Sequence, residues 1–226
     1  MSVDLLPKGL IVSCQAEEGD PFYAPEYVSL FARAAEMGGA VGIRAREAGN
    51  VRAIRRAVSL PLIGLTKSAF PDGRVLITPD FADVAALLEA GADIVAVDAT
   101  NRRRPNGLSG ADFVAALRRQ FPQARILADI ATREEGLAAA EAGAHAVATT
   151  LSGYTPDTEG RGGDGPDWEL LEQLARGSQV PVIMEGRVAS PQQARQALDL
   201  GAHAVVVGTA ITRPRLIVAN YVSALR

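Results

Sequence analysis

The sequence contains little of several residue types on which large classes of protein depend. It has one cysteine, Cys14, and two histidines, which excludes an internal disulfide framework and a cysteine-rich zinc site. A formal net charge of -3 leaves no basic excess for nucleic acid or an anionic membrane surface. No apolar run approaches the roughly 18 residues of a membrane span, and no signal peptide is evident. We therefore expect a cytoplasmic protein with no nucleic-acid or membrane partner.

Aromatic residues are also scarce, at 5% of the chain, although hydrophobic residues make up 48%. The core must therefore be filled mainly by Ala, Val, Leu and Ile, as it is in proteins built on parallel sheets. A length of 226 residues suits one undivided α/β barrel. We therefore expect residues 1–226 to form a single domain.

Short apolar runs rich in Val and Ile alternate with amphipathic segments typical of helices, which is the alternation of βαβ units. Glycine-alanine pairs precede every second run, which indicates a weak repeat of two βα modules. Eight strands, each followed by a helix, predict a single closed (β/α)8 TIM barrel. The eight predicted strands span residues 9–13, 40–44, 62–66, 94–98, 125–129, 146–150, 182–185 and 204–208.

Two connections are longer than the others. Residues 67–80 contain a Pro-Asp-Gly turn signal and a short β-prone run, which we interpret as a loop or hairpin at the barrel mouth rather than a ninth barrel strand. Residues 152–166 are rich in glycine and predict a mobile lid. The segment GRGGDG at 160–165 fits the spacing of a dinucleotide fingerprint, but a long polar loop separates it from the preceding strand. We therefore exclude NAD binding.

Active sites of TIM barrels lie at the C-terminal ends of the strands. Lys67 follows the third predicted strand and Glu185 ends the seventh. These strands lie on opposite sides of an eight-stranded ring, so the two side chains are expected to face each other across a ligand. A lysine in a partly desolvated pocket has a lowered pKa and can act as a base. This pair predicts proton transfer at a carbon beside a carbonyl group. Polar residues lie at nearly every strand end: Ser13, Gln15, Arg44, Lys67, Asp98, Asp129, Thr149, Thr150, Glu185, Arg187 and Thr209.

The loops after the last two predicted strands read EGRVASP and VGTAITRP. Loops at these places often bind phosphate in TIM barrels. Gly186, Gly208 and Thr209 can present backbone N–H groups to an anion, and Arg187 or Arg213 can add a charge-assisted pair. The sequence therefore predicts a phosphorylated small molecule as substrate.

Eight motifs follow one another over nearly the whole chain: GLIVSCQA, GGAVGIRA, LIGLTK, DATNRRRPNG, LADIAT, TTLSGYTP, MEGR and VVVGTAITRP. In these motifs the sequence resembles the N-acetylmannosamine-6-phosphate 2-epimerase family of bacterial sialic acid catabolism. The resemblance implies interconversion of N-acetylmannosamine 6-phosphate and N-acetylglucosamine 6-phosphate without a metal or redox cofactor.

The resemblance assigns catalysis to Lys67 in LTK and Glu185 in MEGR. Ser68 departs from the family, in which a basic residue usually follows the lysine. The same resemblance assigns sugar and phosphate binding to Gln15, Arg44, Asp129 and Arg213. We also expect Thr149, at a strand end, to bind the substrate.

The implied substrate suggests a mechanism. In the open-chain aldehyde the C2 hydrogen is acidic, so Lys67 as a neutral base can form an enolate that is protonated on its other face. Glu185 can orient Lys67, shuttle protons to the sugar oxygens or act as the second acid. Arg44 and Gln15 can stabilise the enolate oxygen or the acetamido group. A one-base and a two-base mechanism both remain open.

Several polar residues also have a structural interpretation. Arg44 can be an interior ion-pair partner of Asp129, and Asp98 can serve either as an interior hydrogen-bonding residue or in substrate binding. The basic run 102–104 is typical of a solvated surface or a subunit contact.

Cys14 is interpreted as a small buried residue, since no histidine lies near it in the sequence to activate it. His145 and His203 precede the sixth and eighth predicted strands. They are therefore expected at the barrel face opposite the active site.

Two other functions are consistent with the same fold. A non-catalytic sugar-phosphate sensor would keep the phosphate loops but would not need both Lys67 and Glu185. Another sugar-phosphate isomerase or epimerase is the second alternative, although the metal-ligating histidines of ribulose-phosphate epimerase-like proteins are absent from the strand ends. The apolar segment 213–226 predicts a homodimer contact.

Overall fold

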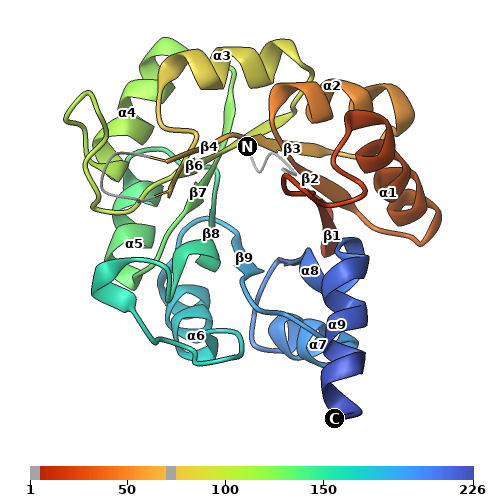
Figure 1. The fold of residues 1–226 in the computed structure, drawn as a ribbon. Helices are drawn as coiled ribbons and strands as arrows, with labels where there is room; N and C mark the ends of the chain where they lie inside the picture. The colour runs from red at the N-terminus through yellow and green to blue at the C-terminus, as the bar shows by residue number, and fades with distance from the viewer. Residues whose placement is uncertain (1–5, 70–74) are drawn as a thin grey trace.

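A computed structural model describes residues 6–69 and 75–226 and shows a closed barrel of parallel strands surrounded by helices (Figure 1). The strand order around the barrel is β1-β10-β9-β8-β7-β6-β3-β2, so the first barrel strand pairs with the last. This confirms the predicted TIM barrel. The barrel strands are β1 (Gly9–Cys14), β2 (Gly42–Arg46), β3 (Leu62–Leu65), β6 (Ile94–Asp98), β7 (Arg125–Asp129), β8 (Ala146–Ala148), β9 (Val182–Glu185) and β10 (Ala204–Val207).

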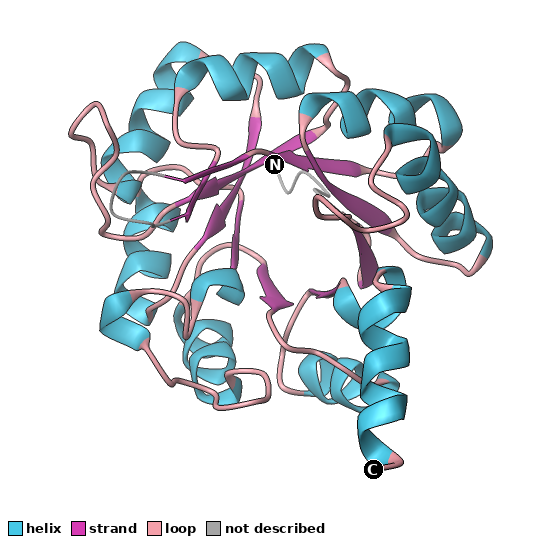
Figure 2. Ribbon diagram, in the orientation of Figure 1, coloured by secondary structure: helices cyan, strands magenta, loops and turns pink. Residues whose placement is uncertain are grey.

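Helices cover the outside of the barrel (Figure 2). Several begin at a polar N-cap side chain that accepts the backbone N–H group three residues further on, which satisfies a donor that the helix itself leaves unpaired. These N-cap residues are Asp80, Ser109, Thr132, Asp167 and Ser190. The α-helices are α1 (Pro25–Met37), α2 (Ala48–Ala57), α3 (Phe81–Glu89), α4 (Gly110–Gln120), α5 (Arg133–Glu141), α6 (Trp168–Gly177), α7 (Pro191–Asp199), α8 (Thr209–Thr212) and α9 (Pro214–Ala224). Two short 3-10 helices, η1 (Thr149–Leu151) and η2 (Pro156–Thr158), follow β8.

Side chains of the barrel strands alternate between two buried layers. Ile11 and Leu127 belong to the cluster inside the barrel, whereas Val12 and Ala128 pack toward the helices. Because the period of a strand is two residues, the next inward position toward each carboxyl end lies at the barrel mouth. Polar residues occupy these positions: Ser13, Arg44, Asp98, Asp129 and Glu185.

The observed strand bounds differ from the prediction by two residues in β2 and β8, and by one residue at the carboxyl ends of β1, β3 and β10. β2 runs from Gly42 to Arg46 rather than from 40 to 44, and β8 ends at Ala148 because the next residues form η1. The connection 67–80 forms an antiparallel pair of its own, β4 (Lys67–Ala69) with β5 (Val75–Ile77), and this confirms that it adds no strand to the barrel. Its Pro-Asp-Gly turn signal lies outside the described residues.

Both histidines lie at the amino-terminal ends of barrel strands, as predicted. His145 Nδ1 accepts a hydrogen bond from the backbone N–H of Ile126 at 3.0 Å. His203 Nε2 lies 2.7 Å from the carbonyl oxygen of Leu6. Among the residues that the structure describes, no helix is both long and apolar enough to cross a bilayer.

Candidate active site

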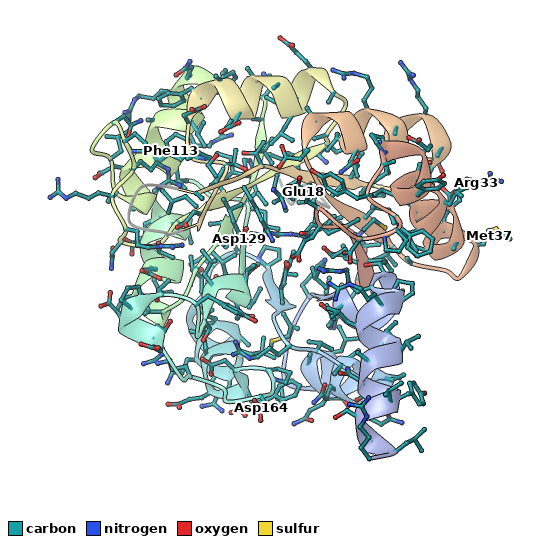
Figure 3. All side chains as sticks on the ribbon, in the orientation of Figure 1. Glu18, Arg33, Met37, Phe113, Asp129 and Asp164 are labelled. Carbon is teal, nitrogen blue, oxygen red and sulfur yellow. The ribbon has the colours of Figure 1, made fainter. Side chains whose placement is uncertain are left out.

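A buried ion pair lies at the mouth of the barrel. Nη1 and Nη2 of Arg44 donate to Oδ1 and Oδ2 of Asp129 at 3.0 and 2.6 Å. The two side chains are 1% and 0% exposed, and Figure 3 shows Asp129 near the middle of the ring of strands. Burial lowers the pKa of Arg44, but the carboxylates of Asp129 and Glu185 more than offset this and raise it. The guanidinium group therefore stays charged.

Glu185, at the end of β9, is the third member of this cluster. Its Oε2 lies 3.1 Å from Nη1 of Arg44, and its side chain is 13% exposed. Burial raises the pKa of Glu185 to about 7, because the nearby charge of Arg44 only partly counteracts desolvation and Asp129 raises the pKa further. The carboxyl group of Glu185 therefore holds a proton up to a pH near neutrality.

Two threonines that follow β8 bind the two acidic residues, one through its backbone and the other through its carboxylate. The Thr149 hydroxyl donates to the carbonyl oxygen of Glu185 at 2.8 Å and accepts the backbone N–H of Glu185 at 3.1 Å. The hydroxyl continues the contact between β8 and β9 past the last paired residues of their ladder. The Thr150 hydroxyl donates to Oδ1 of Asp129 at 2.6 Å. The end of β8 therefore positions both acidic residues.

Lys67 is the first residue of β4 and lies just beyond β3, which is opposite β9 in the barrel. The preceding residue, Thr66, is fixed by Thr78: the Thr66 N–H donates to the Thr78 hydroxyl at 3.2 Å, and the Thr78 N–H donates to the Thr66 carbonyl at 3.0 Å. Thr78 is fully buried at φ 46°, which is rare for a β-branched residue. The base of the hairpin therefore fixes the backbone next to Lys67.

The pKa of Lys67 is lowered. Burial is the largest cause, and the positive charges of Arg44 and Arg46 lower the pKa further, while Glu185 raises it. The pKa values of Lys67 and Glu185 thus move toward each other from opposite ends of the scale. The Lys67 ammonium group therefore loses its proton at a lower pH than an ordinary lysine, and the Glu185 carboxyl group keeps its proton to a higher pH than an ordinary glutamate.

Other predicted ligands lie at the same mouth, in contact with protein groups. The Gln15 amide donates to the Ser13 hydroxyl at 2.6 Å. Nη2 of Arg213 donates to Oε2 of Glu17 at 3.0 Å and lies 3.1 Å from Oδ2 of Asp20. The guanidinium of Arg213 is therefore paired with carboxylates of the loop after β1.

The two predicted phosphate loops lie beside each other, because β9 and β10 are neighbours in the barrel. Gly186 has φ 115°, a conformation that favours glycine. A Cβ atom on Gly208 would lie 3.2 Å from the Cβ of Ser13, so the backbone there is closely packed against β1. Thr209 follows as the first residue of α8. The structure thus brings Gly186, Gly208 and Thr209 to one side of the mouth.

Arg187 contacts the glycine-rich loop that we predicted as a lid. Its Nε donates to the Gly165 carbonyl at 2.6 Å, its Nη1 to the Ser152 carbonyl at 3.0 Å and its Nη2 to the Arg161 carbonyl at 3.0 Å. The guanidinium group therefore joins three separate points of the loop 152–166.

Two of the three arginines in the basic run 102–104 differ from their predicted place at the surface, whereas Arg103 is exposed as predicted. Arg102 is 10% exposed and pairs with Asp98, and Arg104 is 3% exposed and stacks on the Phe113 ring, 4.1 Å from its centroid. Both arginines fold inward toward Asp98, whose carboxylate pairs with Arg102 and whose backbone carbonyl oxygen accepts from Arg104. Nε and Nη1 of Arg104 are buried without a hydrogen-bond partner among the described residues, and burial lowers its pKa to about 10. The Thr100 hydroxyl also donates to Asp98 at 2.6 Å, so the loop itself occupies this carboxylate.

Sequence reasoning missed the positioning roles of Thr78, Thr149 and Thr150. The strand-end position of the pair Thr149–Thr150 was a signal for a role at the mouth, although not for which group each hydroxyl binds. No local signal marked Thr78, because its positive φ follows from tertiary contacts.

These ionisable groups at the carboxyl ends of the strands define a TIM-barrel enzyme. The cluster combines a charged guanidinium, a carboxyl group with a raised pKa and an amine with a lowered pKa. Within residues 6–69 and 75–226, no group of three or more His, Cys, Asp and Glu residues is placed to hold a metal ion.

Comparisons with known proteins identify the family. The family described as "Putative N-acetylmannosamine-6-phosphate epimerase" matches residues 28–226. Relatives described as "Putative N-acetylmannosamine-6-phosphate 2-epimerase" include one from Synechococcus elongatus, 50% identical over 97% of this chain and 94% of its own. Another, from Caldanaerobacter subterraneus, is 46% identical over 100% of this chain and 96% of its own.

A solved structure leads to the same family. It is described as the N-acetylmannosamine-6-phosphate 2-epimerase from Clostridium perfringens and matches with a TM-score of 0.88 at 40% identity, covering 95% of this chain and 92% of that chain. The present chain therefore belongs to the N-acetylmannosamine-6-phosphate 2-epimerase family, a family of isomerases. The resemblance seen in the sequence motifs is confirmed.

Proposed function

We propose that this protein interconverts N-acetylmannosamine 6-phosphate and N-acetylglucosamine 6-phosphate by removing and returning a proton at C2. The observation that carries the proposal is the placement of Lys67 and Glu185 at the ends of opposing barrel strands, around the charge of Arg44. The names of the relatives support the choice of substrate.

Lys67 and Glu185 act as a pair of acid–base groups on the open-chain sugar. The neutral amine of Lys67 takes the C2 proton, and the electron pair of the broken C–H bond moves onto the C1 carbonyl oxygen to give an enolate. Glu185 then donates its proton to C2 from the other side, since the two groups approach from opposite strands. In the reverse direction the carboxylate removes the proton and the ammonium group returns it.

Arg44 supplies positive charge where the enolate oxygen develops its negative charge. Its charge is maintained by Asp129, which forms both of its short hydrogen bonds. Gln15, at the end of β1, binds the acetamido group through its side-chain amide. Thr149 contributes by fixing the peptide of Glu185.

The phosphate group binds between the loops that follow β9 and β10. Gly186, Gly208 and Thr209 present backbone N–H groups there, and a glycine lets the backbone approach an anion closely. Arg213 adds a cation next to α8 and is 11% exposed. This arrangement fixes one end of the sugar and leaves C2 between Lys67 and Glu185.

Proton NMR in deuterated water tests the proposal. Purified protein with N-acetylmannosamine 6-phosphate is expected to give the gluco epimer with deuterium at C2, and Lys67→Ala is expected to abolish this exchange. Lys8→Ala, at the only other lysine, is the matched control and keeps the activity. A wild-type protein that binds the sugar phosphate without exchanging C2 would instead be a sensor.

The same experiment started from N-acetylglucosamine 6-phosphate separates the two mechanisms. With two groups on opposite faces, the Glu185 carboxylate removes the C2 proton from this sugar and holds only that one proton, so the first product molecules carry deuterium while the remaining substrate carries none. Early deuterium in both the substrate and the product would instead show that one group acts on both faces.

We also propose that the protein forms a homodimer through helix α9. The cytoplasmic location stays a prediction. Helix α9 has no buried residue, and it lies at the outer edge of the molecule in Figure 1. Three apolar side chains of this helix, Val218, Tyr221 and Val222, and that of Leu225, which directly follows it, are between 42% and 86% exposed. A second copy covering this face would remove them from water. Light scattering is expected to give a dimer mass, and Tyr221→Asp is expected to give a monomer; a monomeric wild type would refute this proposal.

A further inference from the structure

Arg187 lies two residues after Glu185 and has an unusual backbone conformation. Its φ is 55°, in the left-handed region that residues other than glycine rarely adopt. Its three guanidinium nitrogens donate to the carbonyl groups of Gly165, Ser152 and Arg161. Charge-assisted hydrogen bonds of this kind are roughly twice as strong as neutral ones. The side chain therefore connects the end of β9 to both ends and the middle of the loop 152–166.

The loop is shaped around this guanidinium group. A Cβ atom on Gly153 would lie 2.9 Å from Nη1 of Arg187, and one on Gly162 would lie 2.6 Å from Nη2. Both glycines also have positive φ, 84° and 73°. The ring of Tyr154 lies 5.3 Å from the guanidinium carbon and covers another side of the group. Glycine is therefore needed at two places where the loop backbone approaches Arg187.

The same loop is attached to the catalytic end of the barrel. It starts directly after η1, whose Thr149 and Thr150 hold the Glu185 peptide and the Asp129 carboxylate. The contacts thus form a closed ring. Thr149 binds the Glu185 peptide, the chain continues from η1 into the loop, and Arg187, two residues after Glu185, binds the loop. A phosphate group approaching this guanidinium would meet three carbonyl oxygens, each with partial negative charge.

We propose that Arg187 is a positioning residue that holds the loop 152–166 as a fixed wall beside Glu185, and that it is not the phosphate ligand that the sequence suggested. Its effect on catalysis rests on the proposed function, because it acts through Glu185. Its effect on the loop does not depend on any activity.

Limited trypsin digestion of the folded protein measures the loop directly, since the Arg161 carbonyl that Arg187 binds belongs to the peptide bond that trypsin cuts. Arg187→Lys and Arg187→Ala are both expected to accelerate cleavage after Arg161 by about tenfold or more, the factor for losing one hydrogen bond to a charged group. Arg195→Lys, on the exposed face of α7, is the control and leaves cleavage unchanged. Mass spectrometry identifies the fragment that starts at Gly162.

A second variant tests the contact while keeping the arginine. Gly162→Ala places a methyl group against Nη2 and is expected to release the loop in the same way, with the circular dichroism of the barrel unchanged. If Arg187→Lys and Gly162→Ala both stay as resistant to trypsin as the wild type, the proposal is wrong.

Measurements of kcat and of the affinity for inorganic phosphate distinguish a positioning residue from a phosphate ligand. A positioning role predicts that Arg187→Lys lowers kcat as much as Arg187→Ala does and leaves the affinity for inorganic phosphate unchanged. A phosphate ligand would lose phosphate affinity in the alanine variant and recover part of it in the lysine variant, which keeps the charge. That recovery, with a protected loop, would overturn the proposal. A protein without epimerase activity would refute the proposed function alone, because the digestion result stands independently.

Discussion

Replacing Asp129 by asparagine removes one negative charge from a pair in which Arg44 is 1% exposed. The amide oxygen can still accept one hydrogen bond, but the amide nitrogen would face an N–H group of the guanidinium. Removing one partner of a buried ion pair costs about 3–5 kcal/mol. Glu185 reduces this cost, because its Oε2 lies 3.1 Å from Nη1 and its pKa falls when the charge of Asp129 is removed. We therefore expect a loss of roughly 3 kcal/mol in the free energy of unfolding, the low end of that range.

Thermal and urea unfolding at neutral pH measure this loss. A change of roughly 3 kcal/mol lowers the thermal midpoint by about 6–12 °C in a chain of this size. The double variant Arg44→Met with Asp129→Leu removes both charges and is expected to lose less stability than Asp129→Asn alone, since no guanidinium is left buried without its partner. A cost below about 1 kcal/mol for Asp129→Asn, or a double variant as unstable as the sum of its single variants, would refute this account of the cluster.

Three further predictions concern residues of the proposed mechanism. Burial raises the folded-state pKa of Glu185 to about 7 from 4.5, so its contribution to stability is present below the unfolded pKa and is lost as the pH rises through the folded one. The thermal midpoint of Glu185→Gln should therefore rise relative to the wild type between about pH 5 and pH 8, and a constant difference would contradict this. Lys67→Arg keeps the charge but supplies no base, so deuterium exchange at C2 should fall by about 10²–10⁴ while the sugar phosphate still binds; exchange above about a tenth of the wild-type rate would exclude Lys67 as the base. Thr149→Val should lower kcat by about tenfold by releasing the Glu185 peptide, and Thr149→Ser should restore most of it; equal losses in both variants would argue against the hydroxyl.

Much of the barrel could be predicted because the signals for its elements are local. The alternation of apolar runs and amphipathic segments predicted all eight barrel strands, and no predicted strand end differs from the observed one by more than two residues. Strand periodicity also indicates which residues point inward, so polar residues such as Arg44, Asp129 and Glu185 could be expected at one mouth. The ends of β2 and β8 were placed less well, because pairing and the start of η1 decide where a strand ends.

The partners of those polar residues could not be predicted in the same way. Arg44 and Asp129 are 85 residues apart, and only closure of the barrel brings them together. Arg187 was expected to face phosphate but binds loop carbonyls, and Arg104 was expected at the surface but lies on an aromatic ring. The periodicity of the sequence by itself determined the strands, their inward faces and the end of the barrel that carries the ionisable groups. Only the tertiary structure decided which group each charge meets, because a charged side chain stays buried only where distant segments supply its hydrogen-bond partners or counter-charge.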